Sequence, residues 1–234
     1  AFYGLALEDN DLIKFGPQGL IIPLEGLFEK YAPNMIRIYK ERPQYKKAMT
    51  TSDGHIYSMP TIGEYIWNEY GPTLLMNKAW LDKLNMTVPE TTEDFYKTLK
   101  AFKENDVNGD GKKNEIPFSF VYNDGNNGIH PMFGAFGRVD RPQHIVVEKE
   151  KVVFTANQLE YKEAIKYFNR LYKEGLIDQE SFTQDQNVYF SKGNMKSENG
   201  NSILGAAMSF WMISLLPDEE HKNWVAVPPL KGPN

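Results

Sequence analysis

The most constraining feature of this sequence is a short polar loop, residues 106–115, that lies between two apolar segments. Oxygen-bearing side chains occupy positions 1, 3, 5, 9 and 10 of the loop, and glycine occupies position 6. Ca²⁺ prefers about six to eight oxygen ligands, and alternate positions of such a loop point toward one centre. The spacing therefore predicts a structural calcium site formed by Asp106, Asn108, Asp110, the backbone carbonyl of Lys112, Asn114 and Glu115.

This loop departs from the EF-hand pattern, because position 12 is Pro117 rather than glutamate. Glu115 at position 10 must then close the cage, and no helix is expected to follow it. The alternative is an ordinary polar turn, since Asp, Asn and Gly gather in turns for local reasons. Acidic side chains crowded into one short loop would repel one another without a cation, which favours the metal site.

Composition excludes several classes of protein. The 234 residues carry a net charge of −5 and no cysteine. The negative charge argues against a nucleic-acid partner, and the absence of cysteine excludes disulfides, thiol nucleophiles and cysteine-ligated metals. The longest uncharged apolar stretch, residues 203–216, is shorter than the roughly 20 residues that span a bilayer. The chain begins without methionine or a signal-peptide pattern, so we expect a processed chain or a segment of a longer one.

Hydrophobic periodicity predicts strands that alternate with helices, which is typical of an α/β sheet covered by helices. A helix capped by Thr91 should present Phe95, Leu99 and Phe102 on one face. A second long helix should run through 161–172, and a brief one is expected at 78–84. Strand-like or buried apolar runs are expected at 20–24, 55–60, 73–77, 116–121, 203–216 and 224–230, and a hairpin at 145–154.

Aromatic residues make up 13% of the chain and indicate a sugar-binding surface. Flat amphipathic rings beside carboxylates and amides suit pyranose rings, which have an apolar face and an edge of hydroxyls. Tyr65, Trp67 and Tyr70 lie among acidic and amide residues and are the first candidates for ligand contact, with half-buried packing as the alternative. Trp211 is a further candidate, although core packing competes there, and Trp224 is expected in the core.

The remaining motifs point to no particular chemistry. The four histidines show no metal-ligand spacing, so each is expected to be a surface or hydrogen-bonded residue. No nucleophile elbow, phosphate-binding loop or dinucleotide fingerprint is present in the sequence. A carboxylate pair for glycoside hydrolysis stays open, because the fold and not the sequence spacing sets the distance between two such groups.

Several segments spread along the chain carry a family resemblance. They are 11–24, 53–60, 76–81, 88–95, the loop 106–115, 171–178 and 227–233. Together they resemble the family 1 extracellular solute-binding proteins, the substrate receptors of bacterial carbohydrate importers, over essentially the whole chain. In the lipoprotein and alginate-oligosaccharide branch of that family, the loop that corresponds to 106–115 holds calcium.

The resemblance implies an α/β, type II periplasmic-binding-protein-like fold with mixed sheets flanked by helices and two lobes that close over a sugar. Residues 1–62 are then part of the first lobe, 63–227 form the second lobe with the calcium loop, and 228–234 return toward the first lobe. The family is longer than this chain, so we expect a central piece whose lipid-attachment start precedes Ala1. The implied protein is a monomeric cell-surface lipoprotein, or a periplasmic protein, that delivers sugar to the transmembrane subunits of an ABC permease.

Two functional hypotheses from different classes follow. The first is a receptor without enzymatic activity that binds an oligosaccharide reversibly. The alternative is a polysaccharide-degrading hydrolase braced by calcium, which predicts product release and a catalytic carboxylate pair. A calcium-dependent adhesion module is disfavoured, because the calcium loop occurs once in the sequence.

Overall fold

The computed structural model of the protein describes residues 7–63 and 71–233. The chain divides into two compact units, residues 1–65 and 66–234. The assignment of 1–62, 63–227 and 228–234 to two lobes concerns the whole protein and stays a prediction. Among the described residues, no helix has both the length and the hydropathy that crossing a membrane requires.

The first unit is built from short helices around a small core. Pro33 and Pro43 each stand at the start of a helix, where the fixed φ of proline suits the helix and its missing N–H is not needed. Phe28 and Tyr39 pack edge to face with ring centroids 6.2 Å apart, and Ile56 completes the buried cluster. The helices are α1 (Asp9–Phe15), α2 (Glu25–Tyr31), α3 (Pro33–Glu41) and α4 (Pro43–Met49).

The strands predicted at 20–24 and 55–60 are wrong, because both segments are turns and irregular chain. Pro23 lacks the N–H that a strand ladder needs. The two segments meet where the Leu24 N–H donates to the Ile56 carbonyl at 2.8 Å. The Ile56 N–H then donates to the carboxylate of Glu25 at 2.6 Å, so a side chain at the start of α2 takes the donor that a second ladder bond would use.

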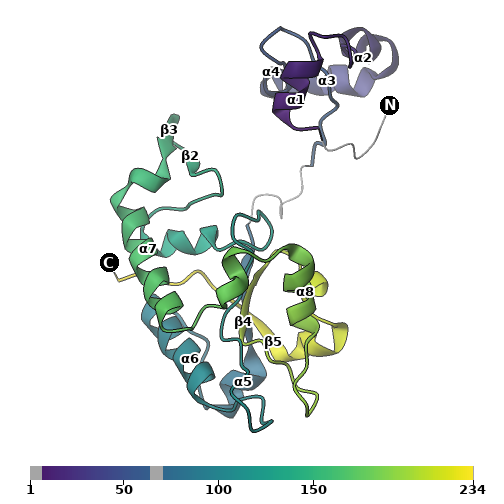
Figure 1. Ribbon diagram of the computed structural model, residues 1–234. Helices are drawn as coiled ribbons and strands as arrows, with labels where there is room; N and C mark the ends of the chain where they lie inside the picture. Colours follow the sequence, from purple (N-terminus) through teal and green to yellow (C-terminus); the bar gives the residue numbers. More distant parts are fainter. Residues whose placement is uncertain (1–6, 64–70, 234) are drawn as a thin grey trace. The chain divides into compact units, whose positions relative to one another are not determined.

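The second unit is built on a sheet of order β4-β1-β5, three antiparallel strands within residues 71–233 (Figure 1). Thr73 of β1 pairs with Ser209 of β4, and Leu74 pairs with Val227 of β5. The strand predicted at 73–77 is therefore confirmed, and both later apolar runs contain a strand. The bounds are β1 (Thr73–Asn77), β4 (Ala206–Ser209) and β5 (Trp224–Val227).

Helices and short 3-10 turns make up most of the remaining regular structure of this unit. The two long helices predicted from periodicity are both present. In chain order the elements are α5 (Lys78–Lys83), α6 (Thr92–Glu104), η2 (His130–Phe136), η3 (Thr155–Asn157), α7 (Leu159–Lys173), η4 (Gln179–Phe182), α8 (Gln186–Asn194), α9 (Met212–Leu215) and η5 (Asp218–Asn223).

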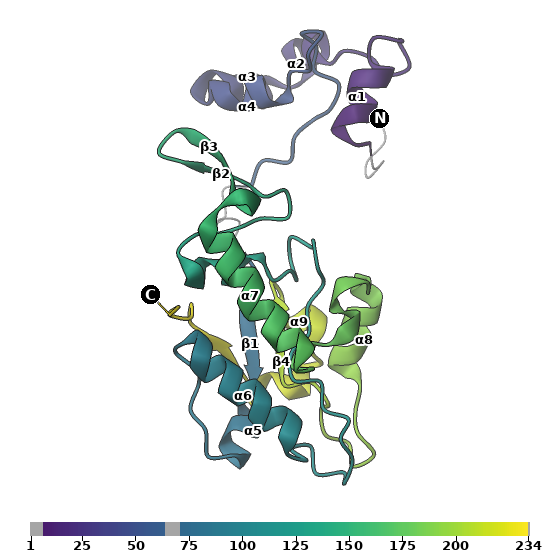
Figure 2. The same cartoon turned by 60° about the vertical axis from the view of Figure 1, so that its left-hand side comes forward.

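Helices cover both faces of the three-stranded sheet (Figure 2). Leu74 and Met76 face the side of α6 and α7 and belong to the main hydrophobic core. Leu75, between them in β1, belongs to a separate cluster with Tyr189 of α8 and Leu215 of α9. Alternate residues of one strand thus serve opposite faces, as expected for a strand buried on both sides. This layered arrangement confirms the predicted α/β class.

Two further strand predictions have different outcomes. The hairpin predicted at 145–154 is confirmed as β2 (Ile145–Glu148) paired antiparallel with β3 (Lys151–Phe154). The segment 116–121 forms isolated parallel bridges, Ile116 to Leu204 and Ser119 to Ala207, instead of a continuous strand. Pro117 has no N–H to donate, and the Phe120 N–H donates to the hydroxyl of Ser181 at 3.2 Å rather than to a neighbouring strand.

The cap of α6 gives a first testable prediction. The Thr91 hydroxyl accepts a hydrogen bond from the Asp94 N–H at 3.0 Å and donates one to the Asp94 carboxylate at 2.7 Å. Thr91→Ala should lower the free energy of unfolding by about 1 kcal/mol, because it leaves a helix-terminal N–H without its partner. Chemical denaturation measures this loss. Thr91→Ser keeps the hydroxyl and should stay near wild type, so an equal loss in both variants would contradict the capping role.

Candidate functional site

The polar loop 106–115 connects the end of α6 to the bridge at Ile116. Two of its residues, Gly109 and Gly111, adopt φ values of +78° and +80°, in the left-handed region that favours glycine. These two turns fold the loop back on itself. The Asp106 side chain is exposed, and its carboxylate faces these turns, where it accepts hydrogen bonds from the N–H groups of Gly109, Asp110 and Gly111 at 2.8, 3.0 and 2.9 Å.

The structure brings three other predicted calcium ligands, Asn108, Asp110 and Asn114, into contact with one another. Asn108 Nδ2 donates to Asn114 Oδ1 at 2.6 Å, and Asn114 Nδ2 donates to Asp110 Oδ2 at 2.8 Å. Lys112 contributes its N–H to Asp110 Oδ1 at 2.9 Å, while its ammonium group pairs with Glu198 outside the loop. These contacts show that the side chains chosen from sequence spacing form one cluster.

Glu115 provides the observation that tests whether a cation fits this cluster. Its Oε1 atom accepts from the Val107 N–H at 3.0 Å, but its Oε2 atom is buried without a hydrogen-bond partner. A buried carboxylate oxygen without a partner is costly. The cluster supplies oxygen ligands from carboxylates and amides, which are the donors that a hard divalent cation prefers. The residues present therefore fit Ca²⁺.

The predicted ligand-binding aromatics have different outcomes. Tyr65, Trp67 and Tyr70 lie outside the described residues, so their role stays a prediction. Trp211 is half exposed, at 50%, and packs edge to face on Phe210 with ring centroids 4.8 Å apart. The competing expectation that Trp211 is buried in the core is wrong, because the chain leaves β4 at Ser209 and carries the ring to the surface at the start of α9. Trp224 is buried, as predicted.

An asparagine-rich loop, residues 123–128, bonds to the two residues that precede Trp211. The Phe210 N–H donates to the Asn126 carbonyl at 2.7 Å, and the Ser209 hydroxyl donates to Asn127 Oδ1 at 3.2 Å. Asp124 fixes the loop by accepting from the N–H groups of Asn126 and Asn127. The sequence analysis assigned this loop no role. The aspartate followed by glycine and two asparagines was the available signal for an ordered polar turn.

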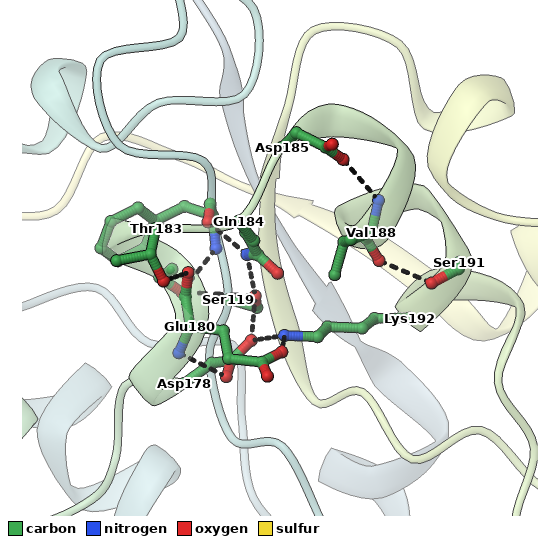
Figure 3. Close-up of polar contacts among 11 residues, drawn as sticks. Ser119, Asp178, Glu180, Thr183, Gln184, Asp185, Val188, Ser191 and Lys192 are labelled. Carbon is green, nitrogen blue, oxygen red and sulfur yellow. Dashed lines mark hydrogen bonds and ion pairs between the residues drawn. The ribbon is translucent and has the colours of Figure 1, made fainter.

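A buried ion pair supports the segment that precedes this loop (Figure 3). Lys192 Nζ of α8 lies 2.6 Å from Asp178 Oδ2, and Ser119 Oγ donates to the same oxygen at 2.8 Å. Gln184 donates to Ser119 Oγ and to the Phe120 carbonyl. This network of an ion pair and hydrogen bonds therefore links α8 and the start of η4 to the segment that leads into the 123–128 loop.

Sequence reasoning missed a second polar cluster, formed by His130, Asp140 and His144. Asp140 Oδ2 lies 2.9 Å from His130 Nδ1 and 3.0 Å from His144 Nδ1, and the Thr155 hydroxyl donates to Oδ1 of the same carboxylate. The three ligand-type atoms lie within 4.8 Å of one another, a spacing that a metal ion could use. The spacing of these residues in the sequence matches no metal motif, because turns of the fold bring them together.

Burial and hydrogen bonding together set the pKa values of His130 and Asp140. Burial lowers the pKa of His130 below its usual value, although the neighbouring Asp140 acts in the opposite direction. Burial would raise the pKa of Asp140, but hydrogen bonds from Thr155 and His130 outweigh it and hold that pKa below its usual value. At neutral pH the imidazole of His130 is therefore neutral and the carboxylate of Asp140 is ionised.

Comparison with known proteins agrees with the fold. The chain matches the family of bacterial extracellular solute-binding proteins over residues 5–234. It is 39% identical to the fructooligosaccharide ABC transporter substrate-binding protein FusA of Streptococcus pneumoniae, over 97% of this chain and 44% of that protein. The chain thus spans less than half the length of this relative.

Solved structures give the same result. S. pneumoniae FusA in complex with kestose, and its EF-hand mutant in complex with fructo-nystose, match 97% of this chain and 46% of those chains at 38% identity, with TM-scores of 0.80 and 0.83. An HMO-binding, ABC-transporter-associated solute-binding protein from Bifidobacterium longum infantis matches 98% of this chain and 47% of that chain at 26% identity, with a TM-score of 0.76. The predicted type II periplasmic-binding-protein-like fold class is confirmed, and this chain belongs to the bacterial extracellular solute-binding protein family.

Proposed function

We propose that this protein is the substrate-binding receptor of a bacterial ABC importer and that it binds an oligosaccharide reversibly, without catalysis. The observation that carries this proposal is the 39% identity to FusA over 97% of the chain. Short fructooligosaccharides are the first ligands to test, because the similar solved structures are complexes with kestose and fructo-nystose. The hydrolase alternative has no comparable support among these relatives.

Within this proposal, the ligand lies against Trp211 and the 123–128 loop. The half-exposed indole offers a flat apolar surface, and Asn126, an exposed residue whose backbone pairs with Phe210, offers a side-chain amide for hydrogen bonds. Tyr65, Trp67 and Tyr70 remain predicted ligand contacts. An apolar ring next to an amide edge is the combination that a sugar requires, since a sugar has an apolar face and hydroxyls around its edge.

The loop 106–115 holds a structural Ca²⁺ in this proposal. The unpaired Glu115 Oε2 supports it, as does the EF-hand named in the similar FusA structure. The ion would balance the carboxylates and brace the junction between α6 and the segment 116–121. The residues that would hold it are Asp106, Asn108, Asp110, Lys112 through its carbonyl, Asn114 and Glu115.

The partners follow from the same family. A receptor of this kind works outside the cytoplasm, as a cell-surface lipoprotein or in the periplasm, and delivers its sugar to the transmembrane subunits of an ABC permease. We expect a monomer whose contact with the membrane comes from a lipid anchor outside the present sequence. The pI of about 5.5 and the net charge of −5 argue against a nucleic-acid partner.

Isothermal titration calorimetry tests the proposed function. The protein in calcium buffer is titrated with kestose and nystose, and separately with maltotriose and cellotriose as sugars of other linkage. Saturable binding to one sugar class supports the receptor. The same sugar, recovered by chromatography after prolonged incubation, should be intact. Release of smaller sugars would favour the hydrolase, and absence of binding to every oligosaccharide would contradict the proposal.

A variant of Trp211 tests where the sugar lies. Trp211→Ala should weaken binding by about 1–3 kcal/mol, the scale of stacking between an aromatic ring and a flat ligand face. Ile213→Ala is the matched control, because Ile213 is an exposed apolar residue of the same short helix α9. Equal affinities of the Trp211→Ala variant and the wild type in calorimetry would remove Trp211 from the ligand site.

A further inference from the structure

Side chains from distant parts of the chain donate hydrogen bonds to backbone carbonyls of the loop 106–115. Lys83 of α5 donates to the carbonyls of Asp106 and Val107 at 3.3 and 2.8 Å. Asn199 and Asn201 both donate through Nδ2 to the carbonyl of Asn108, each at 2.8 Å. Three successive carbonyls are therefore held from outside the loop, and the peptide units that carry the first calcium ligands have a fixed direction.

The turn that contributes the two asparagines is itself firmly built. The Ser197 N–H donates to the Asn201 carbonyl at 2.8 Å, and the Ser197 hydroxyl donates to Asn199 Oδ1 at 2.5 Å. The Asn201 N–H donates to the same Asn199 oxygen at 3.2 Å. Because Oδ1 of Asn199 accepts from its own turn, its Nδ2 must face the loop, and the pairing with a carbonyl fixes the same orientation for Asn201.

The acceptor of both amides is a residue of the predicted calcium site. Asn108 is 1% exposed, its Oδ1 accepts the Asp110 N–H at 3.0 Å, and its Nδ2 donates to Asn114. The peptide unit that carries the Asn108 carbonyl also carries the N–H of Gly109, which donates to Asp106 Oδ1 at 2.8 Å. A rotation of this unit would therefore disturb the carboxylate at the first position of the loop. Groups that hydrogen-bond to metal ligands and fix their orientation affect metal affinity strongly, even though they do not touch the ion.

We infer that Asn199 and Asn201 are positioning residues that set the calcium affinity of the loop 106–115 by fixing the peptide unit of Asn108. This inference rests on the proposed calcium site and deepens it. The turn 197–201 thereby becomes a functional part of the site although it contributes no ligand. The ion pair between Lys112 and Glu198 adds a second connection between the same turn and the loop.

Calcium affinity, measured by calorimetry on chelator-treated protein with CaCl₂, tests the inference. Asn199→Ala and Asn201→Ala should each raise the calcium Kd, within the roughly 10- to 100-fold range typical for loss of an orienting partner. Asn194→Ala is the matched control, because Asn194 is an exposed asparagine whose side chain bonds within α8. Its calcium Kd should equal that of the wild type.

A charge-changing variant separates positioning from simple electrostatics. Asn201→Asp has nearly the same shape, removes the N–H donor to Asn108, and adds a negative charge near the loop. Loss of positioning weakens calcium binding in this variant, whereas long-range attraction alone would strengthen it. Near-UV circular dichroism of each variant in EGTA, compared with calcium-free wild type, shows whether the fold is retained.

The outcomes distinguish the inference from the proposal on which it rests. A wild type that binds no Ca²⁺ would overturn both. A wild type that binds Ca²⁺, with unchanged Kd in Asn199→Ala and Asn201→Ala, would overturn the inference and leave the calcium site standing. Tighter binding in Asn201→Asp would assign the effect to charge and would also overturn the positioning role.

Discussion

Replacing Lys192 by methionine should lower the free energy of unfolding by about 3–5 kcal/mol, the cost of leaving one charge of a buried ion pair without its partner. The Lys192 side chain is 7% exposed and that of Asp178 is 10% exposed. Methionine keeps most of the length and apolar volume of lysine, so the loss reports on charge and not on a cavity. Equilibrium unfolding in urea, followed by circular dichroism, measures it.

Two controls make this prediction specific. Lys78→Met breaks an ion pair with Asp82 in which both side chains are more than half exposed, and it should change stability by about 1 kcal/mol or less. The double variant Lys192→Met with Asp178→Asn removes both buried charges and should regain part of the loss. Glu180, the second carboxylate at 2.6 Å from Lys192 Nζ, is 63% exposed, so water can solvate the charge that stays there. A single variant as stable as the wild type would show that Asp178 finds another partner or water.

The second large effect concerns calcium. A ligand present at about one hundred times its Kd stabilises the folded state by roughly 2.7 kcal/mol. The wild type should therefore melt at a clearly higher temperature in calcium than in EGTA. In Asp106→Ala this difference should vanish, because the variant lacks the carboxylate at the first position of the loop. Differential scanning calorimetry in both buffers measures the effect.

The comparison between the two buffers isolates the ion from other consequences of the substitution. Asp106 also accepts three backbone hydrogen bonds, so Asp106→Ala should be less stable than the wild type even in EGTA. Asp82→Ala removes an exposed carboxylate elsewhere and should keep the full calcium response. A wild type that melts at one temperature in both buffers would refute the calcium site.

Elements that depend on nearby residues were predictable from the sequence. Helix α6 is an example, because its signals all lie within twelve residues: the Thr91 cap and the spacing of Phe95, Leu99 and Phe102. The structure has that helix. The loop 106–115 was predictable for the same reason, because all its candidate ligands lie within ten residues. The apolar run at 20–24 shows the limit of this reasoning. A short apolar run is compatible with a strand, but a strand also needs a partner, and here a carboxylate occupies the neighbouring donor.

The parts of the site that join distant residues could not be predicted. Asn108 and Asn201 meet across the fold, as do Ser119 and Asp178, and neither pair has a signature in local spacing. The grouping of His130 with His144 around Asp140 depends on the turns that precede the hairpin β2–β3. Such contacts follow from tertiary structure, and a single sequence without known coordinates contains no direct record of them.

The order of strands in the sheet has a kinetic consequence. The central strand β1 comes first in this unit, and both of its neighbours, β4 and β5, come from the far end of the chain. Closing such long loops is slow, because the entropy of the intervening chain is lost before the strand pairs form. Helix α6 can form early, but the sheet must wait until residues near 227 are available. A piece of this unit that ends before residue 224 would therefore lack one of the two neighbours of β1.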